Sequence, residues 1–190
     1  ESHWNQAVLL KVRGRLEPAA LERAAQALEA RHDALRLRFV KEAGRWKQVV
    51  VKAAGVVGVA DAAHVTHALV GSHAAQTSQP TQPTHATQAT QATQTAIVHH
   101  EHLSSLSALT AACERLQSSL DIGRGPLWRI GHFETPDETR LLIAIHHLSV
   151  DGVSWRVLLE ELQTAYAQAE QDEPIALPPP SMSWRAWVRA

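Results

Sequence analysis

Cysteine is almost absent from this sequence of 190 residues, since Cys113 is the only one. One thiol excludes an intrachain disulfide and a cysteine-rich zinc site, and nothing points to an oxidising compartment, so we expect a cytoplasmic protein. Long apolar runs are also lacking, and the longest ones, such as Leu141–Ile145, are too short to span a membrane. Residues 1–20 lack the charged and then apolar order of a signal peptide.

Net charge of one sign is lacking too. Lys plus Arg number 18 and Asp plus Glu number 19, so no broad positive field exists to attract nucleic acid. No glycine-rich phosphate loop follows any predicted strand, so nucleotide binding has no support. Hydrophobic residues at 45% and charged residues at 19% are typical of a soluble, packed protein, and the length predicts one domain over residues 1–190.

The first part of the chain predicts a strand, a helix and a hairpin. Residues 6–13 are aliphatic and β-branched, which favours a strand that stops at Gly14. Apolar residues at spacings of three and four then predict a helix over about residues 18–34, with a proline in its first turn. Alternating residues 35–40, a turn, and residues 46–52 predict two paired strands.

A low-complexity insertion of Thr, Gln, Ala, Ser, Pro and His occupies residues 71–96 and is expected to be disordered, because it has little to bury. After it the apolar spacing predicts a helix, two strands and another helix, over residues 104–120, 127–133, 139–148 and 153–168. Residues 181–190 start a further helix that the chain end cuts off. The order predicts an α/β sandwich with a mixed sheet rather than a doubly wound fold.

One motif carries chemistry. His146-His147-x-x-x-Asp151-Gly152 stands where a buried strand ends before a helix, a position where ligand-facing groups collect. Because a strand alternates its side chains, only one of the two histidines can face a given cleft, where it could act as a general acid or base. Asp151 either caps Ser154 or pairs with an arginine. The alternative is two buried, hydrogen-bonded histidines and an ordinary helix cap.

Two other residue groups are interpreted as structural. His99-His100-Glu101-His102 looks like a metal site by composition, but it adjoins the insertion and lacks a fixed scaffold, so we interpret it as a solvated polar cluster and predict no metal site. Core packing is the expected role of the tryptophans in or beside predicted elements: Trp4, Trp46, Trp128 and Trp155.

The segment from Ile145 to Leu162, which contains the motif, closely resembles the active-site motif of condensation and epimerization domains of nonribosomal peptide synthetases. Its Asp-Gly-Val-Ser-Trp-Arg form is most similar to the epimerization branch. Residues 4–10 resemble the opening strand of epimerization domains, and residues 32–39 resemble the His-x-x-Leu-Arg-x-x-Phe segment of the family. The resemblance covers nearly everything outside the insertion.

This resemblance implies a chloramphenicol-acetyltransferase-like lobe, the N-terminal half of a two-lobe domain. It implies that His147 performs proton transfer on a substrate held as a thioester on the phosphopantetheine arm of a peptidyl carrier protein, with no cofactor bound by the lobe itself. His146 and Gly152 are supporting residues, Asp151 is structural and pairs with Arg36, or with Arg38 on the same strand face, and Ser154 and Trp155 are expected to contact substrate.

The resemblance leaves three functions open. Epimerization of an aminoacyl or peptidyl thioester is the leading one, and there the second proton-transfer group is a glutamate of the C-terminal lobe, which lies beyond residue 190. Condensation, in which His147 assists attack of an amine on the thioester, is the alternative. A non-catalytic lobe that docks a carrier protein is the third.

Overall fold

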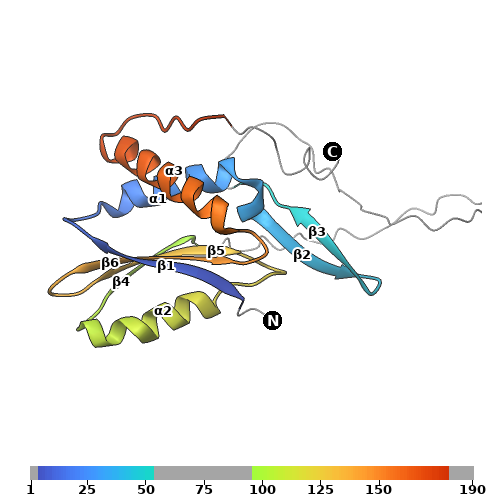
Figure 1. Ribbon diagram of the computed structural model, residues 1–190, viewed down its shortest axis with the longest axis horizontal. Helices are drawn as coiled ribbons and strands as arrows, with labels where there is room; N and C mark the ends of the chain where they lie inside the picture. The colour runs from blue at the N-terminus through green and yellow to red at the C-terminus, as the bar shows by residue number, and fades with distance from the viewer. Residues whose placement is uncertain (1–3, 54–95, 180–190) are drawn as a thin grey trace, which may run out of the picture.

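The computed structural model describes residues 4–53 and 96–179. The predicted insertion therefore lies outside the described residues except for Ala96, and so does the helix predicted for residues 181–190. The elements are shown in Figure 1 and follow the order β1 (Asn5–Val12), α1 (Pro18–Arg31), the 3-10 turn η1 (Asp33–Arg36), β2 (Leu37–Glu42), β3 (Arg45–Val50), β4 (Val98–His102), the 3-10 turn η2 (Leu106–Ala108), α2 (Leu109–Ser118), β5 (Trp128–Glu134), β6 (Thr139–His146) and α3 (Gly152–Glu170).

The main sheet has four strands in the order β1-β6-β5-β4, and β2 pairs with β3 in a separate hairpin. Strand β6 is antiparallel to both of its neighbours, whereas β4 and β5 are parallel. The predicted mixed sheet is thus confirmed, and β6 is central in it. Among the described residues, no helix is long and apolar enough to cross a membrane.

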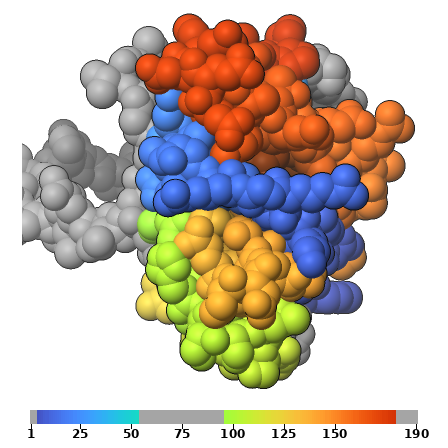
Figure 2. All heavy atoms as spheres, turned by 90° about the vertical axis from the view of Figure 1, so that its left-hand side faces the viewer, coloured from blue at the N-terminus to red at the C-terminus, as the bar shows by residue number. Residues whose placement is uncertain are grey.

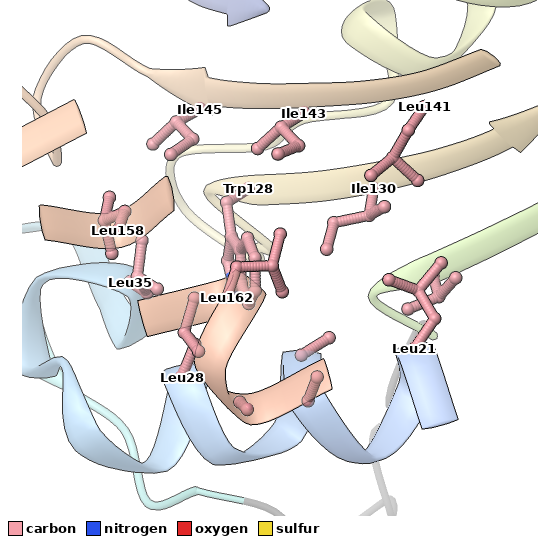
Figure 3. Packing of buried hydrophobic residues seen from close by; sticks show 14 of the residues in the cluster. Leu21, Leu28, Leu35, Trp128, Ile130, Leu141, Ile143, Ile145, Leu158 and Leu162 are labelled. Carbon is pink, nitrogen blue, oxygen red and sulfur yellow. The ribbon is translucent and has the colours of Figure 1, made fainter. Parts of the chain in front are cut away.

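Helices α1 and α3 cover one face of this sheet and α2 covers the other (Figure 1). Figure 2 shows the same layers from the end, with α3 above β1 and α2 below it. Ile143 and Ile145 of β6 pack under α1 and α3 against Leu28 and Leu158 (Figure 3), while Leu142 packs against α2. Both faces of β6 are therefore buried, as its continuous apolar run predicts.

Strand β4 corrects the interpretation of residues 99–102 as a loose, solvated cluster. This segment is paired in register with β5, with His100 opposite His132. Their Nδ1 atoms lie 2.9 Å apart, and His132 is only 2% exposed. The segment is polar because it forms the edge of the sheet, where one side of the strand lacks a neighbour. Its polarity concealed the strand from a prediction based on hydrophobic periodicity.

Two of the tryptophans expected in the core are not there. Trp128 is 1% exposed, as predicted, and Trp155 is half-buried against the cluster under α1 and α3. Trp4 and Trp46 are 70% and 62% exposed, so their prediction as core residues is wrong. Trp4 precedes the first residue of β1 and Trp46 lies on the hairpin outside the main sheet, so neither is covered by a helix layer.

Candidate active site

The motif residues form the junction between β6 and α3. Because β1 runs antiparallel to β6 with Asn5 opposite His146, the start of β1 lies beside this junction. The backbone N–H of His147 donates to the carbonyl of Trp4 at 2.8 Å, which extends the pairing by one step. The site is therefore built from the beginning of β1, the end of β6 and the beginning of α3.

The two histidines differ sharply in burial. His146 is the last residue of β6 and is 3% exposed. Its partner across the sheet, Asn5, donates to the carbonyl of Gln117 in α2 at 3.0 Å, which places this pair on the α2 side. His147 lies in the following turn and is exposed. Only His147 is thus open to a ligand, in agreement with the expectation from strand alternation.

The His147 ring is held at Nδ1, which lies 3.2 Å from the carbonyl oxygen of Val150. A carbonyl only accepts hydrogen bonds, so this contact places the proton on Nδ1 and leaves Nε2 as the unprotonated nitrogen. The indole of Trp4 stands edge-on to the imidazole with 6.1 Å between ring centroids. The result is one accessible, oriented imidazole with a basic nitrogen, which is a suitable general base.

Asp151 is the N-cap of α3. One of its carboxylate oxygens accepts both the backbone N–H and the hydroxyl of Ser154, each at 2.7 Å. These hydrogen bonds lower the pKa of Asp151. Of the two alternatives that the sequence left open for Asp151, the helix cap is the one in the structure. By starting α3 at Gly152, the cap shapes the turn that carries His147.

The expected pairing of Asp151 with Arg36 or Arg38 is wrong in this structure. Arg36 lies in η1 rather than on a strand, and its guanidinium pairs with Asp33 at 2.5 Å and donates to the carbonyls of Glu29 and Ala30. The last carbonyls of a helix need donors, so the end of α1 competes for this arginine.

Arg38 is also engaged away from Asp151. Its guanidinium donates to the backbone carbonyls of Arg124 and Leu37 at 2.9 and 2.7 Å. Neither arginine therefore holds the motif aspartate, and the turn around His147 depends on the helix cap instead.

The remaining predicted site residues lie at the start of α3. Nothing lies within 4 Å of a Cβ built on Gly152, so no neighbour among the described residues requires a glycine there. The hydroxyl of Ser154 is occupied by Asp151, and the indole N–H of Trp155 donates to the side-chain oxygen of Gln6 at 2.6 Å. Contact of Ser154 and Trp155 with substrate remains a prediction.

Gln6 is a residue of this site that the motif analysis did not single out. Its side-chain nitrogen lies 3.1 Å from Nε2 of His147, while its oxygen accepts from Trp155. A polar residue at the start of an otherwise apolar strand was the available signal. The contact itself depends on the β1–β6 register, with Gln6 opposite Ile145, which cannot be read from the sequence.

The chemistry available at the junction is acid–base chemistry. Within residues 4–53 and 96–179, no group of three or more histidine, cysteine or carboxylate side chains is arranged to hold a metal ion. His147 is the exposed titratable side chain of the junction, and its neighbours Gln6, Trp155 and Val150 contribute hydrogen bonds. One oriented imidazole can take or return one proton.

Comparison with known proteins identifies the family. The description of the condensation domain matches residues 1–68 and 67–190. A linear gramicidin synthase of Brevibacillus parabrevis is 39% identical over 188 residues, which is 98% of this chain and 3% of that protein. Surfactin synthase subunit 2 of Bacillus subtilis (strain 168) is 34% identical over 186 residues, 98% of this chain and 4% of that protein. The chain thus corresponds to a small part of these synthases.

Solved structures agree with this assignment. The epimerization domain from the third module of tyrocidine synthetase B is 28% identical with a TM-score of 0.74, over 99% of this chain and 35% of that one. The first condensation domain of the CDA synthetase, at 19% identity and a TM-score of 0.62 over 93% of this chain and 37% of that one, shares the fold. The lobe-sized overlap agrees with the predicted α/β lobe. This chain belongs to the condensation-domain family of nonribosomal peptide synthetases.

Proposed function

We propose that this chain is the N-terminal lobe of an epimerization domain, which inverts the α-carbon of an aminoacyl or peptidyl group held as a thioester on a carrier protein. The observation that carries the proposal is the accessible imidazole of His147, whose Nδ1 is bound to the carbonyl of Val150. The 28% identity to a solved epimerization domain favours this member of the family.

The reaction needs a base and an acid on opposite faces of the α-carbon. A thioester acidifies its α-hydrogen, so Nε2 of His147 can remove that proton, which leaves an enolate and an imidazolium. A second acid then delivers a proton to the other face, which restores the carbon with inverted configuration. Exchange of both groups with water returns the imidazole to its neutral form and the acid to its protonated form.

The second acid and the second wall of the site belong to the rest of the domain in this proposal. The chain matches 35% of the solved epimerization domain chain, so most of such a domain lies outside it. We assign the second acid to a carboxylic acid of the C-terminal lobe and the substrate to the phosphopantetheine arm of a peptidyl carrier protein. The chain itself supplies His147 with its supporting residues His146, Asp151 and Gly152.

Condensation is the competing function, and the condensation-domain match supports it equally. There His147 would assist attack of an amine on the thioester, so that an amide forms and the thiol of the donor arm leaves. In that reaction the α-hydrogen of the donor is not exchanged. The fate of this one hydrogen therefore separates the two functions.

The experiment offers an aminoacyl thioester on its carrier protein to the complete protein that contains this lobe, in deuterated water. Epimerization predicts incorporation of deuterium at the α-carbon without any amine acceptor, and loss of incorporation in His147→Ala. Amide formation with an aminoacyl acceptor, without α-deuteration, would instead establish condensation. Carrier binding with neither reaction would leave a docking lobe.

A further inference from the structure

Gln6 connects two residues of the site through its side-chain amide. Its oxygen accepts from the indole nitrogen of Trp155 at 2.6 Å, and its nitrogen lies 3.1 Å from Nε2 of His147. Gln6 sits on β1 and Trp155 in the first turn of α3, whereas His147 lies in the turn between β6 and α3. The amide therefore ties together all three segments that build the site.

The indole decides which way the amide of Gln6 faces. An indole N–H is only a donor, so the group opposite it must be the amide oxygen. The amide nitrogen, which only donates, then has to face the imidazole of His147. Without Trp155, the two ends of the amide would be exchangeable by a rotation of its terminal bond.

Both sides of the His147 ring then specify the same tautomer. At Nδ1 the ring meets the carbonyl of Val150, a pure acceptor, at 3.2 Å. At Nε2 it meets the amide nitrogen of Gln6, a pure donor, at 3.1 Å. The arrangement is satisfied only when Nδ1 carries the proton and Nε2 carries the lone pair. A free neutral imidazole populates both tautomers.

The position of the amide leaves the Nε2 lone pair approachable. The nitrogen of Gln6 is also 3.4 Å from Nδ1 of the same ring. A donor in line with the Nε2 lone pair would be much farther from Nδ1, because the lone pair points away from that atom. The amide therefore lies beside the ring edge that joins the two nitrogens, and a substrate can reach the lone pair.

We propose that Gln6, oriented by Trp155, is the positioning residue that keeps His147 in its Nδ1-protonated tautomer with Nε2 available as the base. The catalytic consequence rests on the proposed function, whereas the tautomer is a property of the chain itself. Trp155 accordingly acts through its indole N–H on Gln6.

The test replaces the amide of Gln6 by a carboxylate of the same shape. In Gln6→Glu the indole N–H of Trp155 keeps an acceptor, but His147 now faces an acceptor at Nε2 as well as at Nδ1. Nitrogen NMR of the 190-residue chain labelled with ¹⁵N-histidine is expected to show Nε2 of His147 unprotonated in the parent and protonated in Gln6→Glu. Gln26→Glu makes the same chemical change at an exposed position of α1 and should leave both signals unchanged.

A second variant keeps the test decisive if Gln6→Glu does not fold. Trp155→Phe removes only the indole N–H, so the amide loses its fixed orientation and the His147 signals should show a mixture of tautomers. A parent in which Nε2 is the protonated nitrogen, or a Gln6→Glu variant whose folded chain keeps the parental signals, would overturn the proposal.

Turnover separates this proposal from the proposed function. In the complete protein, Gln6→Glu should slow α-deuteration by about 10²-fold or more, the usual contribution of a general base. Trp155→Phe should slow it by about fivefold, the effect of one hydrogen bond. If the parent itself exchanges no α-hydrogen while the NMR signals change as expected, the epimerization function fails and the role of Gln6 stands.

Discussion

At the scale of single residues, the two adjacent histidines have different roles. His147 is exposed, so His147→Ala should change the free energy of unfolding by only about 0.5 kcal/mol while lowering turnover about 10²- to 10⁴-fold. His146 is 3% exposed, so His146→Ala should cost about 1–3 kcal/mol through the polar groups that it leaves behind. Urea denaturation and α-deuteration together check this. Loss of turnover in a stable His146→Ala variant, with His147→Ala active, would reverse the assignment.

Asp151 contributes as a helix cap, so its substitutions should follow capping preferences. Asp151→Ala removes the acceptor for Ser154 and should lower the free energy of unfolding by about 1 kcal/mol at neutral pH, whereas Asp151→Asn keeps an acceptor and should cost less. Melting curves of the two variants compare them. A loss in Asp151→Asn as large as that in Asp151→Ala would show that the charge matters more than the cap.

The same carboxylate gives a pH dependence with a definite sign. Because the hydrogen bonds from Ser154 lower the pKa of Asp151 in the folded chain, its contribution to stability is present above the unfolded pKa of about 3.9. It is lost as the pH falls through the lower folded value. The stability difference between the parent and Asp151→Asn should therefore shrink in acid, and a difference that grew there would contradict this.

At the scale of elements, α1 and α3 are joined by an ion pair with little exposure. Arg31 and Glu161 lie 2.8 Å apart with side chains 13% and 9% exposed, and His32 adds a contact to Glu161 at 2.5 Å. Burial alone would raise the pKa of Glu161, but hydrogen bonds from Arg31 and His32 outweigh it and lower the pKa. The carboxylate is thus charged where the two helices meet.

Removing one partner of this pair should be costly and removing both should not. Glu161→Leu leaves Arg31 partly buried without its carboxylate and should cost about 3–5 kcal/mol, whereas Arg31→Met combined with Glu161→Leu should recover most of that loss. Chemical denaturation of the two single variants and the double variant measures this. A double variant no more stable than either single variant would show that the pair itself, rather than the unpaired charge, matters.

The pairing of β4 with β5 makes part of the stability depend on pH. Burial lowers the pKa of His132, with smaller effects of Glu134 in the opposite direction and of His100 and His102 in the same direction. The unfolded chain therefore binds a proton here that the folded chain does not. Stability should fall as the pH drops from about 6.5 through the lower folded pKa, by at most about 1.4 kcal/mol per pH unit.

His132→Gln should flatten this pH dependence, because it removes the titrating group. His99→Gln on the neighbouring strand, where the side chain is half-exposed, is the matched control and should keep the parental slope. Urea denaturation between about pH 7.5 and pH 5.5 spans the relevant range. An unchanged slope in His132→Gln would assign the pH dependence to other groups.

At the scale of the whole molecule, the proposed reaction needs more than this lobe. Removal and return of a proton on opposite faces require two positioned groups, and a shielded enolate requires two walls. We expect the 190-residue chain to bring about no appreciable α-deuteration, and activity to appear when the C-terminal lobe is added in trans. Exchange by the chain alone, abolished in His147→Ala, would show that one lobe suffices.

Much of the architecture was readable from hydrophobic periodicity. The apolar stripes of α1 and α3 and the doubly apolar β6 follow directly from residue spacing, because each element has to bury its apolar side. Polar β4 was missed because an edge strand buries too little to show that period. The ends of α1 and β6 were predicted too far along the chain, since a 3-10 turn and the His147 turn replace the last predicted residues.

The motif also identified His147 and the capping role of Asp151, because both depend on neighbours within four residues along the chain. The partners of Arg36 and the contact of Gln6 with His147 depend instead on strand register and on which groups compete for each donor. Register is a relation between β1 and β6, segments far apart in sequence, and no local spacing encodes it. The proton-transfer group was therefore evident from the amino-acid order, whereas the residues that orient it emerged from how the chain packs.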